Sequence, residues 1–159
     1  MENLSKYLFQ ALDNYPYDLE ATVEALDYAL SEAPESVPAL VLAGRIHMEY
    51  LKDYATALSF FEEALAVDMH AVEVYGYYID ALLKLNEYAR ADRFILFAYG
   101  VKGSDKALLL YKKAMLLERL SMYKAAVRHL NKAMKYSYED EFIEKLQKEK
   151  KRIKKKAKK

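Results

Sequence analysis

Apolar and small residues recur with the same spacing in three segments of the chain. The segments are DYATALSFFEEAL (53–65), EYARADRFILFAY (87–99) and MYKAAVRHLNKAM (122–134). In each one a Tyr at the second position precedes a small residue, a large apolar residue and another small residue, at intervals of four and then three. That spacing places the three side chains on one face of an α-helix. The pattern therefore predicts three equivalent amphipathic helices.

These segments are copies of one internal repeat. Tyr54, Tyr88 and Tyr123 are 34 and 35 residues apart. A weaker copy, DLEATVEALDYAL (18–30), has the same spacing. The small–large–small sets of the four copies are Thr22/Leu26/Ala29, Ala57/Phe61/Ala64, Ala91/Ile95/Ala98 and Ala126/Leu130/Ala133. A repeat of this length predicts a row of helical units, each of which buries its apolar face against its neighbours.

A second helix is expected upstream of each clear copy, over residues 37–51, 71–85 and 105–119. Their apolar stripes are Leu40/Ala43/His47, Tyr75/Tyr78/Leu82 and Leu110/Ala114/Leu117. Each unit is therefore predicted to consist of a helix, a short turn and a second helix. The alanines of the repeat, with Gly44 opposite, let the two helices of a unit approach closely.

The predicted helix starts rest on capping residues. Pro38 suits the first turn of a helix, Ser104 is a predicted N-cap, and Ser137 with Asp140 resembles a capping box for the last helix.

This pattern resembles the tetratricopeptide repeat family. The period, the small–large–small second helix and the Tyr at its start are the matching features, and Gly44 and Pro34 match as well. Leu40, Tyr75 and Leu110 replace the family's Trp. The resemblance implies an all-α, right-handed solenoid of about four repeats, over residues 3–36, 37–70, 71–104 and 105–138. We expect a repeat domain at 1–138 and a capping helix with a frayed polybasic tail at 139–159.

The resemblance also implies a binding groove that is lined by the first helix of each unit. The residues at its groove-facing positions are Arg45, Met48, Glu49, Tyr77, Asp80, Lys84, Tyr111, Lys112, Met115 and Arg119. Aromatic, Met and Arg side chains are enriched in the anchors of protein interfaces. Among the tyrosines, Tyr77 and Tyr111 are predicted to be exposed. We therefore expect a protein or peptide partner in this groove.

The composition excludes several kinds of chemistry. The chain has 159 residues and no Cys, so disulfides and Cys-based zinc sites are absent. The three His residues do not form a site, because His47 lies on a core stripe, His70 in a turn and His129 on a different second helix. No phosphate-binding loop or nucleophile motif occurs. We therefore expect no enzyme activity, no cofactor and no metal. No segment is apolar enough to span a membrane, and no basic region followed by an apolar stretch begins the sequence, so we expect a cytoplasmic protein.

Charge is segregated along the chain. Residues 1–80 hold 3 basic and 15 acidic groups, residues 81–144 hold 12 and 8, and residues 145–159 hold 10 and 1. This asymmetry suggests a charged partner or self-association. Several alternatives to groove binding stay open. They are polyanion binding, including nucleic acid, through the 148–159 tail; contact of that tail with the acidic first repeats of another copy; a chaperone role for a secreted or assembling client; and homodimerisation at an exposed end of the solenoid, where terminal repeats leave apolar faces.

Overall fold

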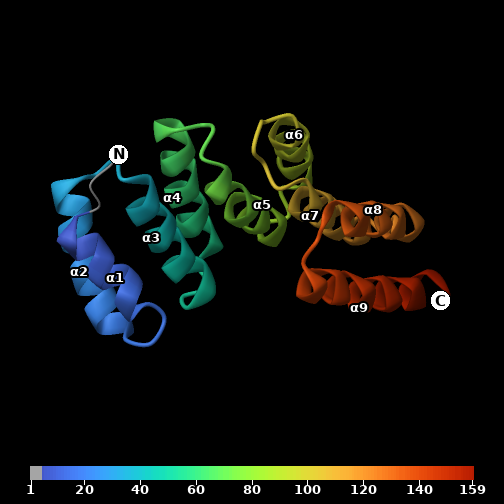
Figure 1. Cartoon of the computed structure of the whole chain (residues 1–159), viewed down its shortest axis with the longest axis horizontal. Coiled ribbons are helices and arrows are strands. Elements are labelled where there is room, and N and C mark those ends of the chain that lie inside the picture. The colour runs from blue at the N-terminus through green and yellow to red at the C-terminus, as the bar shows by residue number, and fades with distance from the viewer. Residues whose placement is uncertain (1–4) are drawn as a thin grey trace. The chain divides into compact units, whose positions relative to one another are not determined.

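The computed structural model describes residues 5–159, and all regular structure in that range is helical (Figure 1). Its nine α-helices are α1 (Lys6–Asn14), α2 (Leu19–Glu32), α3 (Val37–Glu49), α4 (Tyr54–Val67), α5 (Tyr75–Lys84), α6 (Tyr88–Tyr99), α7 (Lys106–Arg119), α8 (Tyr123–Tyr136) and α9 (Asp140–Ala157). A short 3₁₀ helix, η1 (Val72–Val74), precedes α5. The predicted all-α class is confirmed.

The chain folds as two compact units. Unit 1 ends at Ala81 and unit 2 begins at Leu82, so the division falls inside α5. In unit 1, α1 packs against α2 and α3 against α4; in unit 2, α7 packs against α6 and α8, and α8 against α9 (Figure 1). The repeat ranges and the domain boundary at residue 138 stay predictions. The expected start of the first repeat, near residue 3, lies outside the described residues.

Five helices begin at a side chain that caps them. The Ser or Asp oxygen accepts a hydrogen bond from the backbone N–H three residues later at Ser5, Asp18, Ser36, Asp53 and Asp105. Such a cap satisfies one of the backbone donors that a helix leaves unpaired at its start. The cap of α7 is Asp105, so the prediction of Ser104 was wrong by one residue.

The turns inside three repeats share one backbone feature. Lys52, Asn86 and Ser121 have φ angles of 53°, 60° and 59°, in the left-handed region that non-glycine residues seldom adopt. Each lies two residues before the Tyr that begins the second helix. The hydroxyl of Tyr88 donates to Asn86 Oδ1 at 2.9 Å, and that of Tyr123 to Ser121 Oγ at 3.5 Å. This contact gives the repeated Tyr a local role in closing the turn.

The small–large–small sets form the core, as predicted. All twelve of their side chains are buried. Gly44 of α3 lies against the ring of Phe61 of α4, where a Cβ atom would be 2.8 Å from Cδ1 and Cζ and nearer still to Cε1. The two helices therefore approach closely because one of them has no side chain at this point.

The last helix caps unit 2 and continues further than expected. Leu146 and Ile153 of α9 are fully buried in a cluster with Leu110, Leu130 and other residues of α7 and α8. We predicted fraying after Lys148, but the helix continues to Ala157 because Ile153 is anchored in this cluster. The predicted capping box does not form: no side chain caps α9, and Ser137 Oγ instead accepts from the Glu139 N–H at 3.2 Å.

Candidate functional site

An arginine lies between two tyrosine rings in unit 1. The Arg45 guanidinium carbon is 4.9 Å from the ring centre of Tyr15 and 5.2 Å from that of Tyr77. Tyr15 ends α1, Arg45 lies on α3 and Tyr77 on α5, so three consecutive first helices supply the set. Both rings are within the range of cation–π attraction. We call Tyr15, Arg45, Glu49 and Tyr77 the first-helix cluster.

Glu49 completes this cluster. Its carboxylate accepts a hydrogen bond from the Tyr15 hydroxyl and another from Arg45 Nε, the latter at 3.3 Å. Partial burial raises the pKa of the Glu49 carboxyl, and nearby Lys52 opposes that rise. Arg45 and Glu49 are one turn apart on α3, so their pairing also stiffens the helix face. The cluster is thus held in place by two hydrogen bonds and two ring contacts.

Met48 and Asp80, the other two residues of unit 1 that were predicted to face the groove, are half-buried. Met48 lies between Arg45 and Glu49 in the sequence, and Asp80 is one turn beyond Tyr77 on α5. Met48 and Glu49 are three and four residues after Arg45, so these three side chains lie on one side of α3. Asp80 is three residues after Tyr77 and Lys84 is four residues after Asp80, so these three lie on one side of α5. Lys84 ends α5 and is exposed, in the part of that helix that belongs to unit 2.

In unit 2 the last helix covers two of the predicted groove residues. Tyr111 is only 8% exposed, and its ring meets that of Phe142 of α9 edge-on at 5.9 Å. Met115 packs against the same apolar cluster. The prediction that Tyr111 is exposed was therefore wrong, because α9 occupies the space in front of it. Tyr111 and Met115 act in this structure as core residues that hold α9.

Lys112 and Arg119 also have local contacts in unit 2. Lys112 Nζ is 5.4 Å from the ring centre of Tyr111. Arg119 is exposed, and its Nη1 donates to the Leu83 carbonyl at 3.4 Å. The structure thus places the predicted residues in two separate sets, one in each unit, and joins Arg45, Glu49 and Tyr77 in one connected arrangement.

Glu118 of α7 is a charged site that sequence reasoning missed. Its side chain is 11% exposed and pairs with Arg152 through both carboxylate oxygens, one at 2.8 Å, and with Lys156 Nζ at 2.6 Å. The hydrogen bond from Arg152 is the main reason that the pKa of Glu118 falls to about 2. Tyr15 was missed as well, because it lies before the weaker copy (18–30), where no first-helix stripe was predicted.

Two negative findings bear on function. Among residues 5–159, no group of three or more His, Cys, Asp or Glu side chains is arranged to hold a metal ion. No helix in this range is long and apolar enough to cross a membrane.

His47, from the predicted core stripe, is half-buried, and its Nδ1 is 3.9 Å from Asp53 Oδ2.

Comparisons with known proteins agree with the repeat pattern. A family model described as tetratricopeptide repeat matches residues 51–96. A crystal structure of MamA protein superposes with a TM-score of 0.68 at 17% identity, and covers 82% of this chain and 70% of that one. Another MamA crystal structure gives 0.64 at 18% identity, with 89% and 92% covered. No curated protein matches the chain. At these identities the structures show a shared fold, and the match to the tetratricopeptide repeat family model covers residues 51–96 of this chain.

Proposed function

We propose that the chain is a non-catalytic scaffold that binds a segment of a partner protein at the first-helix cluster of unit 1. The repeat fold supports a general role in protein–protein interaction. The single observation that carries the proposed site is Arg45 held between the rings of Tyr15 and Tyr77. Among the residues predicted for the groove, Arg45, Glu49 and Tyr77 belong to this connected arrangement in unit 1.

The geometry of Arg45 suits recognition of a polypeptide. Only its Nε–H is used by Glu49, so the Nη hydrogens remain available as donors to a carbonyl oxygen of the partner. The flanking rings supply apolar contact area around that hydrogen bond. Because the rings and Glu49 already fix the guanidinium, binding costs little side-chain entropy. Arg and Tyr are also the residue types that dominate binding energy in protein interfaces.

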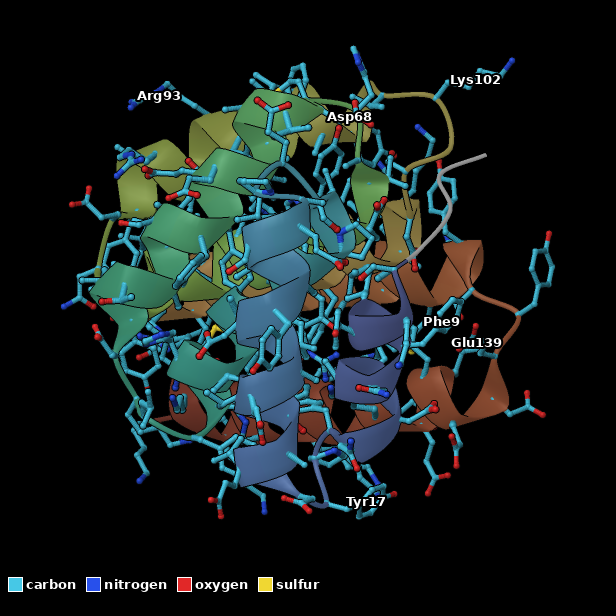
Figure 2. The ribbon with its side chains drawn as sticks, turned by 90° about the vertical axis from the view of Figure 1, so that its left-hand side faces the viewer. Phe9, Tyr17, Asp68, Arg93, Lys102 and Glu139 are labelled. Atoms are coloured by element: carbon cyan, nitrogen blue, oxygen red, sulfur yellow. The ribbon has the colours of Figure 1, made fainter. Side chains whose placement is uncertain are left out.

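The test is to select binding peptides from a random displayed library against the purified chain, and then to measure their affinity for two variants. Arg45→Lys keeps the charge but loses the planar group that stacks between the rings. We expect binding to weaken about tenfold, which corresponds to the loss of cation–π and hydrogen-bond contacts. The matched control is Arg93→Lys on α6, where the side chain extends from an exposed helix face (Figure 2).

The result that contradicts the proposal is equal affinity of the selected peptides for the wild type and Arg45→Lys. Circular dichroism and thermal unfolding of both variants verify that the fold is intact. Peptides that lose binding only when residues 145–159 are removed would place the interaction on α9 instead.

A second candidate function is polyanion binding through α9. Because the helix is ordered to Ala157, exposed lysines at positions 148, 151, 155 and 158 recur at intervals of three and four on one face. Binding of heparin or of an RNA oligonucleotide would then weaken steeply with salt, in proportion to the number of anionic groups contacted. Binding that is unchanged between low and high salt, or after replacement of these lysines by Gln, would rule this out.

A further inference from the structure

The second helices of the four repeats carry a graded charge. By count of their Lys, Arg, Asp and Glu residues, α2, α4, α6 and α8 carry −4, −2, +1 and +4. The charged side chains of α2 and α8 are opposite in sign, because α2 contains no Lys or Arg and α8 contains no carboxylate. The two compact units follow the same division, with 3 basic and 15 acidic residues up to Ala81 and 22 basic and 9 acidic residues from Leu82.

The cations of α8 form an exposed stripe. Lys124, Arg128, Lys132 and Lys135 are spaced by four, four and three, on the side of the helix opposite to its buried residues. Lys132 Nζ lies 5.7 Å from the ring centre of Tyr99. In the described part of the chain, Lys124, Arg128 and Lys135 make no ion pair. Three of the cations line an open cleft on this surface with Asn131 and Tyr136.

The carboxylates of α2 form the counterpart. Glu20, Glu24 and Asp27 are exposed at spacings of four and three, and none has an ion-pair partner among residues 5–159. Two apolar side chains lie among them, with Val23 40% and Tyr28 53% exposed. An acidic stripe with exposed apolar side chains has the composition of a contact surface.

The two stripes match at two positions. Leu26 of α2 and Leu130 of α8 hold the same place in their repeats, and by that register Glu20 corresponds to Lys124 and Glu24 to Arg128. A separation of four residues corresponds to about 6 Å along a helix axis, so two helices side by side can pair both charges at once. The α2 helix of this same chain therefore carries negative charges at the spacing that pairs with Lys124 and Arg128 of α8.

We propose that the α8 stripe docks the α2 stripe of a second copy of this chain. The contact joins two different surfaces, so each added copy still presents one free stripe and association can continue head to tail. Complementary charge accelerates the encounter and selects the register. The α2 stripe identifies the occupant, because it carries carboxylates at the spacing of two α8 cations; a nucleic acid on α8 is an outcome that the test below distinguishes. This surface is distinct from the first-helix cluster.

The test is a charge-swap experiment read by analytical ultracentrifugation at low and high salt. One variant carries Glu20→Lys with Glu24→Lys, and the other carries Lys124→Glu with Arg128→Glu. We expect the wild type to associate at low salt and to dissociate as salt rises. Each variant alone should lose association about tenfold or more, since attraction becomes repulsion at two pairs of charges. An equimolar mixture of the two variants should associate again, because each then meets the opposite charge.

The control is Lys154→Glu with Lys155→Glu on α9, which changes the net charge as much as the α8 variant does and should leave association intact. A wild type that stays monomeric at all concentrations and at low salt overturns the proposal. So does a mixture of the two variants that fails to associate while both are folded by circular dichroism. Binding of an RNA oligonucleotide that depends on Lys124 and Arg128, without self-association, would assign α8 to a polyanion instead.

Discussion

Replacing Gly44 by Ala tests the close approach of α3 and α4. A Cβ at this position would lie 2.8 Å from two atoms of the Phe61 ring and nearer to a third, whereas ordinary contacts begin at 3.4 Å. The ring must therefore move by about 0.6 Å or more, and a close-packed core resists such a shift. Phe61 is fully buried and stacks on Tyr77, with ring centres 5.9 Å apart, so it has no free direction in which to turn.

Two opposing effects set the size of the change. Overpacking a core by one methyl group costs about 1–3 kcal/mol, and contact with three ring atoms at once places Gly44→Ala in the upper part of that range, at about 2–3 kcal/mol. An Ala in a helix interior is favoured over Gly by about 1 kcal/mol, which offsets part of that cost. We expect Gly44→Ala to lower the free energy of unfolding by about 1–2 kcal/mol, which lowers Tm by about 2–4 °C per kcal/mol in a chain of this size.

The sequence itself supplies a compensating change. Ala114 and Leu130 are the counterparts of Gly44 and Phe61 in the last repeat, and both lie fully buried in one cluster. A larger residue on the first helix is thus accompanied by a smaller one on the second. Phe61→Leu alone should cost about 1–2 kcal/mol through the cavity that it leaves. In the double variant the two costs should not add, with a coupling of about 1 kcal/mol or more.

The assay is urea and thermal denaturation of the wild type, both single variants and the double variant, followed by circular dichroism. Gly100→Ala is the matched control, because its added Cβ would meet only the Phe97 carbonyl oxygen at 3.6 Å, an ordinary contact. That variant should stay within about 0.5 kcal/mol of the wild type. A Gly44→Ala protein as stable as the control, or strictly additive effects in the double variant, would refute the steric argument.

Two further predictions concern the turns and the last helix. Lys52→Gly should stabilise the fold by about 1 kcal/mol, because Lys52 has a positive φ that Gly adopts more readily. Ser121→Gly and Asn86→Gly should gain less, because each also removes the side chain that accepts a hydrogen bond from Tyr123 or Tyr88, and because Asn tolerates a positive φ better. Thermal melting of the three variants checks this order. At Glu118 the folded-state pKa of about 2 lies below the ordinary value of 4.5, so the ion pairs stabilise α9 above about pH 4.5 and this contribution is lost as the pH falls towards 2. Glu118→Gln should therefore cost about 1–2 kcal/mol at pH 7, since partial exposure of Arg152 weakens the pairing. It should cost almost nothing at about pH 1, below the folded-state pKa. Hydrogen exchange of the α9 amides in the wild type and in Glu118→Gln measures this cost. An equal difference between the two proteins at both pH values would contradict the role of the Glu118 ion pairs.

The repeat pattern predicted the core well, because burial within a hairpin is fixed by spacing along the chain. The three residues of each small–large–small set, spaced one turn apart along the second helix, are all buried. Helix ends were less certain, since neighbouring polar residues compete to cap the same turn. Ser104 and Asp105 illustrate this, because both have a suitable side chain and only the second accepts the Leu108 N–H.

The candidate site could be predicted only in part, because the contacts that decide it join distant residues. The resemblance placed Arg45, Glu49 and Tyr77 on groove-facing positions, and these three are indeed adjacent in unit 1. It gave no indication of Tyr15, whose hydroxyl donates to Glu49 from 34 residues earlier. Nor did it show that a helix near the end of the chain would cover Tyr111, since that requires the position of α9.

The order of α9 depends on unit 2 rather than on its own sequence. Its last turns are crowded with lysines whose mutual repulsion opposes a helix, and only Ile153 and Ala157 are apolar there. Burial of Ile153 and the pairing of Arg152 and Lys156 with Glu118 offset that repulsion.

The packing of α9 against α7 also decides which first helix a partner can contact. On α7, the residues at the places of Val41 and Arg45 on α3 are Tyr111 and Met115, and both pack under or beside α9. A segment that binds at the matching place in unit 2 would first have to displace α9, and so break the ion pairs of Glu118. In unit 1 the equivalent place holds Arg45 with its Nη donors unused. Binding in unit 1 therefore carries no such cost, which is the physical reason for proposing the first-helix cluster over its counterpart in unit 2.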